Sequence, residues 1–149
     1  ALWQNIPALQ EFPKWVQQKG LPGGTYPGSM DKRIAMICKD RGMEIPPYLN
    51  VQGKAELLPL LREALKSGRM VCVTYSFSPS GRYGGGRISH MVNLVHLDEK
   101  YACILDNNYI GEDKYEWITV DQFVRTFTWG SNGWAMVFLA PSPPPLPWN

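Results

Sequence analysis

Two polar residues at the ends of neighbouring apolar stretches have the side chains needed for acid–base chemistry. His90 begins the stretch HMVNLVHL, and Asp106 follows the stretch YACIL, with Asn107 directly after it. The residues DEK between the stretches are typical of a tight turn, so we expect a β-hairpin that places His90 opposite a position near 107 or 108. An acid or an amide beside an imidazole fixes its tautomer and orientation. The hairpin therefore predicts that Asp106 and Asn107 lie beside His90.

These residues alone leave two interpretations open. A strand-end histidine near a strand-end acid is more often structural than catalytic. The alternative is that they are the base and the orienting residue of a Cys-His-Asp or Cys-His-Asn catalytic set. The other histidine, His96, lies six positions further along the same stretch, and we expect it to be a satisfied structural residue.

The elements that must position these residues are predicted to be helices in the first half of the chain and mainly strands in the second. Apolar residues at helical spacing predict helices first, over residues 7–19, 30–42 and 54–68. β-Branched and aromatic residues then predict five strands, over residues 69–77, 88–97, 101–106, 115–120 and 132–140, with a short helix over 120–127. Helices followed by antiparallel strands indicate an α+β domain. We expect one domain over residues 1–140 and an extended, proline-rich tail over 141–149.

Several residues mark the expected element boundaries. Ser29 is a candidate N-cap for the helix over 30–42, and Gly42 is placed to end it. Pro59 is an exception inside the helix over 54–68, because proline removes a backbone donor. The segment MEIPPYLNVQG, residues 43–53, is expected to be an extended connector.

Composition excludes several function classes. The chain has 149 residues with 44 % hydrophobic and 19 % charged residues, which fits one globular domain. The net charge is only +2 and the basic residues are scattered, which argues against a nucleic-acid partner. No apolar run approaches the roughly 18 residues of a membrane span. No Cys or His cluster suggests a metal or cofactor. The three cysteines, Cys38, Cys72 and Cys103, are expected to be buried free thiols.

The glycine-rich segment SPSGRYGGGR, residues 78–87, lies between the first two predicted strands. It lacks the Lys-Ser/Thr ending of a phosphate-binding loop and does not open a helix. We interpret it as a flexible flap beside His90, since mobile glycine loops often border substrate clefts; a plain surface loop is the alternative. Of the six tryptophans, Trp117, Trp129 and Trp134 are expected to pack beside the hairpin, where one could shield the His90–Asp106 pair.

The second half of the chain resembles a known family. The segments SHMVNLV, ILDNN, YEWITVDQF and NGWAMVFLAP are similar to the C-terminal half of papain-like cysteine peptidases of the C39-like group. That half typically has a strand with the pattern H-[FM]-V-x-[LV], a turn, and a strand ending in Asp. The resemblance implies a papain-like fold in which His90 is the catalytic base and Asp106 its orienting residue, with Asn107 as the other orienting candidate. The N-terminal segment ALWQNIPALQEFPKWV resembles the region after the nucleophile's helix.

The sequence departs from this family at the nucleophile. The family's cysteine lies at the N-terminus of the first helix, where the helix dipole lowers the thiol pKa. Cys38 lies late in a predicted helix, and Cys72 and Cys103 lie within predicted strands. We therefore expect the nucleophile to come from a segment upstream of Ala1, or from a second chain after processing, and the present chain alone to be inactive. A peptidase-like fold without activity is the remaining explanation.

Two functions follow as hypotheses. The first is a C39-like cysteine peptidase domain that hydrolyses a peptide or protein substrate once the upstream cysteine is present. The second is a non-catalytic, papain-like binding or structural module within a larger assembly, with its tryptophans and proline-rich tail as contacts.

Overall fold

The computed structural model describes residues 17–20 and 27–140. The chain divides into two compact units, one of residues Thr25–Pro141 and one of residues 1–24 and 142–149. Of the predicted helix over 7–19, the structure describes only the end, where Gln17 and Gln18 are helical. The tail over 141–149 lies outside the described residues.

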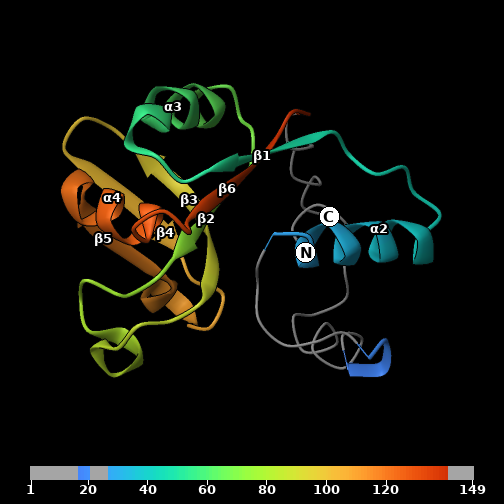
Figure 1. The fold of residues 1–149 in the computed structure, drawn as a ribbon, viewed down its shortest axis with the longest axis horizontal. Coiled ribbons are helices and arrows are strands. Elements are labelled where there is room, and N and C mark those ends of the chain that lie inside the picture. The colour runs from blue at the N-terminus through green and yellow to red at the C-terminus, as the bar shows by residue number, and fades with distance from the viewer. Residues whose placement is uncertain (1–16, 21–26, 141–149) are drawn as a thin grey trace, which may run out of the picture. The chain divides into compact units, whose positions relative to one another are not determined.

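This unit is α+β and contains one antiparallel sheet of six strands (Figure 1). The spatial order is β1-β6-β2-β3-β4-β5. The strands are β1 Tyr48–Gln52, β2 Val71–Tyr75, β3 His90–Leu97, β4 Tyr101–Leu105, β5 Tyr115–Thr119 and β6 Trp134–Phe138. Five of them coincide with predicted strands. The prediction of an extended connector over 43–53 missed β1, an edge strand that pairs with β6 alone among the described strands and has no continuous apolar run to identify it.

The described helices begin and end close to their predicted boundaries. They are α2 Ser29–Asp40, α3 Leu58–Lys66 and α4 Val120–Thr128. Pro59 lies in the first turn of α3, after a 3-10 turn over Ala55–Leu57, and proline is tolerated there because the first-turn N–H groups have no intrahelical partner. The prediction of Ser29 as N-cap is wrong. Gly28 occupies that position with φ 84°, and its N–H donates to the Asp31 carboxylate at 3.0 Å.

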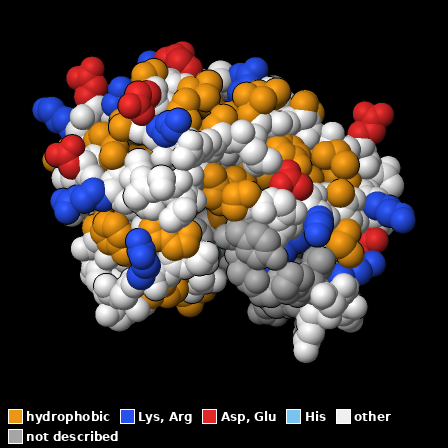
Figure 2. All heavy atoms as spheres, viewed as in Figure 1, with side chains coloured by type: hydrophobic (Ala, Val, Ile, Leu, Met, Phe, Trp, Pro, Cys, Tyr) orange, Lys and Arg blue, Asp and Glu red, His pale blue; other side chains and the backbone are white. Residues whose placement is uncertain are grey.

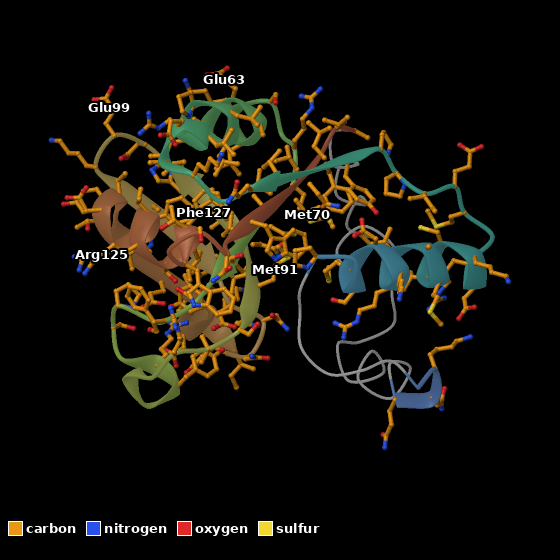
Figure 3. All side chains as sticks on the ribbon, viewed as in Figure 1. Glu63, Met70, Met91, Glu99, Arg125 and Phe127 are labelled. Carbon is orange, nitrogen blue, oxygen red and sulfur yellow. The ribbon has the colours of Figure 1, made fainter. Side chains whose placement is uncertain are left out.

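The helices pack on opposite faces of the sheet because side chains alternate along each strand. The main core lies on the face covered by α3 and α4, which contribute Leu61, Ala64, Phe123 and Phe127. A second cluster on the other face joins Cys72, Met91, Trp134, Met136 and Phe138 to Met30 and Ile34 of α2. In Figure 3, Phe127 lies between α4 and the sheet, whereas Glu63, Glu99 and Arg125 point outward.

The edge strand β5 is protected at both ends by side chains. The residues of β5 whose backbone groups face away from β4 are Tyr115, Trp117 and Thr119, because the intervening residues bond to β4. The guanidinium of Arg82 donates to the carbonyl of Tyr115 at 3.0 Å, and the side chain of Gln122 accepts from the Thr119 N–H at 2.9 Å. These contacts leave little open backbone for another strand to pair with.

The surface carries charges of both signs. Figure 2 shows Lys and Arg side chains interspersed with Asp and Glu on the face that it draws. Within the described ranges, no helix has the length and apolarity needed to cross a membrane.

Candidate functional site

A β-bulge sets the register that brings the predicted residues together. Leu97 pairs with Ala102 and His96 with Cys103, but the register shifts between Leu94 and His96, so that Leu94 pairs with Ile104. Continuing this register past the end of the ladder places His90 opposite Asn108, as the hairpin argument predicted. The bulge also turns His96 away from the face of His90, whereas regular alternation would place both side chains on the same face.

His90 and Asp106 are in direct contact. Nε2 of His90 lies 2.9 Å from Oδ1 of Asp106, and the predicted juxtaposition is confirmed. The Asp106 side chain is completely buried, while that of His90 is 17 % exposed. Oδ1 of Asp106 also accepts the backbone N–H of Asn108 at 3.0 Å. The contact therefore joins a partly accessible imidazole to a carboxylate without access to water.

The charge of Asp106 determines which nitrogen of His90 carries the proton. Burial raises the pKa of Asp106, but hydrogen bonds from His90, Tyr83 and the Asn108 backbone outweigh it, and the pKa lies below the ordinary value of 3.8. An ionised carboxylate only accepts hydrogen bonds, so Nε2 of His90 must be the donor. In the neutral ring, Nδ1 then carries the lone pair, and in the described part of the chain no hydrogen bond engages it. Nδ1 is therefore the ring nitrogen of His90 that is available to accept a proton.

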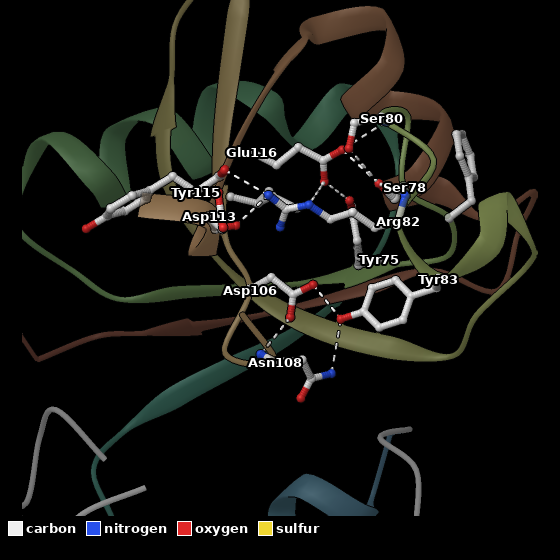
Figure 4. A network of polar contacts seen from close by, with 12 residues as sticks. Tyr75, Ser78, Ser80, Arg82, Tyr83, Asp106, Asn108, Asp113, Tyr115 and Glu116 are labelled. Carbon is white, nitrogen blue, oxygen red and sulfur yellow. Dashed lines mark hydrogen bonds and ion pairs between the residues drawn. The ribbon is translucent and has the colours of Figure 1, made fainter. Parts of the chain in front are cut away.

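Tyr83 and Asn108 complete this site, and neither of them was predicted from the sequence as a site residue. The hydroxyl of Tyr83 donates to Oδ2 of Asp106 at 2.6 Å and accepts from Nδ2 of Asn108 at 3.1 Å (Figure 4). Tyr83 interrupts the glycine run GRYGGGR, and a bulky residue in such a run was the available signal. Asn107 is exposed; the amide beside His90 belongs instead to Asn108, whose Nδ2 lies 3.4 Å from Nε2.

The glycine-rich loop lies beside His90, as predicted, but it is tied down. Its anchor is a second buried carboxylate, Glu116, which accepts from Ser78 Oγ at 2.8 Å and from the Ser80 N–H at 3.0 Å. The hydroxyl of Tyr75 also donates to Glu116, and Nε of Arg82 lies 4.0 Å from its other oxygen. Burial raises the pKa of Glu116, and the Ser80 N–H partly opposes this effect. Figure 4 shows Arg82 between Glu116 and the carbonyls of Asp113 and Tyr115.

The aromatic neighbours of His90 are tyrosines. The rings of Tyr75 and Tyr83 lie edge-on to the imidazole, with centroids 6.5 and 6.0 Å away. Trp117 lies beside the hairpin, as predicted, but it is 62 % exposed on the outer face of β5 and does not shield the His90–Asp106 pair. Its ring contacts that of His96, 5.2 Å away. His96 is also paired with Asp98 at 2.9 Å, which confirms that it is a satisfied histidine.

The cysteines do not have the environment of nucleophiles. All three are free and buried, which confirms the prediction for Cys38, Cys72 and Cys103. Burial raises the pKa of Cys72 to about 12, and its thiol donates to Oδ1 of Asn93 at 3.2 Å. Burial also raises the pKa of Cys103. Over residues 17–20 and 27–140, no group of three or more Cys, His, Asp and Glu side chains is placed to hold a metal ion.

Comparison with known proteins adds no identification. No family model matches the chain, and no curated protein matches it.

Proposed function

We propose that this chain carries the base and the orienting acid of a papain-like, C39-like cysteine peptidase, and that its nucleophilic cysteine lies outside residues 1–149. The observation that supports the proposal is the His90–Asp106 contact of 2.9 Å, in which the acid is buried and Nδ1 of His90 has no described partner. This is the arrangement that an imidazole base needs, with one nitrogen held by an acid and the other available to a substrate or a thiol.

The proposed reaction is the hydrolysis of a peptide bond in a peptide or protein substrate. The thiol of the external cysteine gives its proton to Nδ1 of His90, and the thiolate attacks the carbonyl carbon of the scissile bond. The imidazolium then donates this proton to the leaving amine as the C–N bond breaks. Water, deprotonated by His90, hydrolyses the thioester and restores the thiol. Throughout, Asp106 holds Nε2 and stabilises the imidazolium.

The cysteines of this chain support an external nucleophile. Cys38, Cys72 and Cys103 are 4 %, 8 % and 2 % exposed. Nucleophilic thiols are ionised and accessible, whereas buried thiols in apolar surroundings are inert. Cys72 illustrates the difference, since its pKa is raised to about 12 by burial.

The test uses the full-length gene product, including any residues encoded upstream of Ala1, and a thiol-reactive peptide probe. We expect one upstream cysteine to be labelled at a helix start, and His90→Ala to abolish this labelling because the base is lost. His96→Ala is the matched control and leaves labelling unchanged, since His96 is paired with Asp98. A full-length product without an upstream cysteine, or equal labelling of the His90→Ala variant, would overturn the proposal.

A second candidate is a non-catalytic module in a larger assembly. It is favoured by the outer face of β3, β4 and β5, where Val95, Tyr101 and Trp117 are 43 %, 51 % and 62 % exposed. Neighbouring exposed apolar side chains often mark protein contacts. This candidate predicts that Trp117→Lys abolishes assembly while His90→Ala does not. The peptidase proposal predicts that His90→Ala abolishes probe labelling and that Trp117→Lys does not.

A further inference from the structure

The two oxygens of the Asp106 carboxylate have separate partners. Oδ1 accepts from His90 Nε2 and from the backbone of Asn108, whereas Oδ2 accepts only the hydroxyl of Tyr83 among the described contacts. Asp106 is fully buried, so Oδ2 has no access to solvent. The terminal torsion of an aspartate is broad and roughly two-fold. The partner of Oδ2 therefore decides whether Oδ1 stays directed at His90.

Tyr83 holds an unusual backbone conformation at this position. Its φ and ψ are 58° and 29°, in the left-handed region, where a bulky side chain is disfavoured. The neighbouring Gly84 and Gly85 have φ of 72° and 71° without this cost, since glycine has no Cβ. A tyrosine in such a place indicates that its side chain has a specific role. Its side chain contacts the carboxylate of Asp106, the amide of Asn108 and the rings of His90 and Tyr109.

The loop is positioned independently of the Tyr83 hydroxyl. Glu116 holds Ser78 and Ser80 at the base of the loop. The Arg82 guanidinium donates to the carbonyl of Tyr115 and lies over the Tyr109 ring, 4.3 Å from its centroid. Removal of the Tyr83 hydroxyl therefore leaves the loop in place and removes only the hydrogen bonds of this hydroxyl with Asp106 and Asn108.

We propose that Tyr83 is a positioning residue, which holds the Asp106 carboxylate in the orientation that presents Oδ1 to Nε2 of His90. The role in hydrolysis rests on the proposed function, but the geometry that Tyr83 maintains does not. Without the hydroxyl, Oδ2 is left buried without a donor, the carboxylate rotates or admits water, and the His90–Asp106 hydrogen bond weakens.

The test is an NMR measurement on the present chain. The sequence contains only two histidines, so the imidazole signals of His90 are assigned with a single His96→Asn variant. In the unsubstituted chain we expect the Nε2–H proton of His90 to be observed at low field and protected from exchange with water. In Tyr83→Phe we expect exchange at least about tenfold faster, on the scale of one lost hydrogen bond to a charged group. Unchanged exchange would overturn the proposal.

Two further variants separate positioning from a general effect on the loop. Tyr109→Phe is the matched control, because its ring also contacts Tyr83 but no hydrogen bond of its hydroxyl is found in the described part of the chain. It leaves the exchange of His90 unchanged. Tyr83→Asn suits the left-handed backbone but lacks the phenol, and it accelerates exchange at least as much as Tyr83→Phe. If Tyr83→Asn preserved the slow exchange, Tyr83 would have only a structural role in the loop and the proposal would fail.

Activity distinguishes this inference from the proposed function. In a full-length product with an active cysteine, Tyr83→Phe lowers kcat about tenfold with little change in KM, since the loss concerns the base and not substrate binding. Faster exchange in a protein without peptidase activity would support the positioning role and overturn the proposed function alone. Peptidase activity with an unchanged kcat in Tyr83→Phe would overturn the positioning role alone.

Discussion

Leu94 and Leu97 pack into the same hydrophobic core, although they lie three positions apart on one strand. In a regular strand, residues three apart face opposite sides of the sheet. The bulge between Leu94 and His96 inserts one residue and restores the core-facing side after it. Because His90 has the same parity as Leu94, this bulge also sets the face on which His90 meets Asp106.

Deletion of Val95 tests the role of the bulge. Without the extra residue, Leu94 and Leu97 lie two positions apart, so regular alternation keeps both side chains in the core and the strand needs no bulge. We therefore expect the deletion variant to fold, with a loss of only about 1 kcal/mol in the free energy of unfolding. Val95→Ala is the control: Val95 is exposed, and the expected change is within about 0.5 kcal/mol. Urea denaturation measures both, and a loss of about 3 kcal/mol on deletion, comparable to removing a buried leucine side chain, would contradict the assignment of Val95 as the inserted residue.

The pH dependence of stability tests the charge of Asp106. Its pKa in the folded protein is below 3.8, so the ionised carboxylate stabilises the fold. This contribution is complete above pH 3.8 and is lost as the pH falls toward the folded-state pKa. The stability difference between the unsubstituted chain and Asp106→Asn is therefore largest near neutral pH and shrinks in acid. The raised pKa of Glu116 changes stability with pH in the opposite direction, but Glu116 is present in both proteins. Its contribution therefore cancels in the stability difference. A difference that is independent of pH would contradict this assignment.

Glu116→Gln tests the anchor of the loop. The substitution leaves the guanidinium of Arg82, which is 14 % exposed, without its anion. Breaking one partner of a buried ion pair costs about 3 kcal/mol, and we expect a loss of this size in urea denaturation. The loop over residues 78–86 also becomes more sensitive to proteolysis, because Arg82 loses its counterion and the hydrogen bonds of Ser78 and Ser80 to a charged carboxylate become weaker bonds to a neutral amide oxygen. Glu112→Gln, at an exposed position in the preceding turn, is the control with no effect on either measurement.

Two glycines in one turn are expected to differ in their tolerance of alanine. A Cβ on Gly133 would lie 1.8 Å from the carbonyl oxygen of Phe127, so the backbone must move. We expect Gly133→Ala to cost about 3 kcal/mol, at the upper end of the effects of overpacking. A Cβ on Gly130 meets nothing within 4 Å, but its φ is +67°. Gly130→Ala therefore costs only about 1 kcal/mol, from backbone strain. Thermal unfolding of the two variants measures the difference, and the opposite order would refute the packing argument.

Thiol accessibility tests the burial of the cysteines. In the native chain at neutral pH, Cys38, Cys72 and Cys103 react slowly with a disulfide reagent because all three thiols are buried. After unfolding in denaturant, all three thiols react quickly. Fast modification of any one of them in the native chain, located by mass spectrometry, would reopen the question of a nucleophile within these residues.

Local patterns determined much of the fold. The alternation in YEWIT and the β-branched residues of VCVTY identified strands, because one face of each must be buried. The helical spacing of apolar residues over 54–68 identified α3, and the short turn after Leu97 identified the β3–β4 hairpin. The contact between His90 and Asp106 followed from that hairpin, since two strands joined by a tight turn have little freedom in register.

The tertiary structure decided the features that depend on contacts between distant residues. β1 forms a strand because β6 pairs with it, and the residues of β1 have no pattern that predicts a strand. Tyr83 reaches Asp106 across 23 positions, and Glu116 reaches Ser78 across 38. The bulge at Val95 places Leu94 and Leu97 on the same face of the sheet, whereas a regular strand would place them on opposite faces. Such contacts form because burial and strand pairing lower the free energy of the whole domain. A local stretch of the sequence does not show which distant residues it will meet.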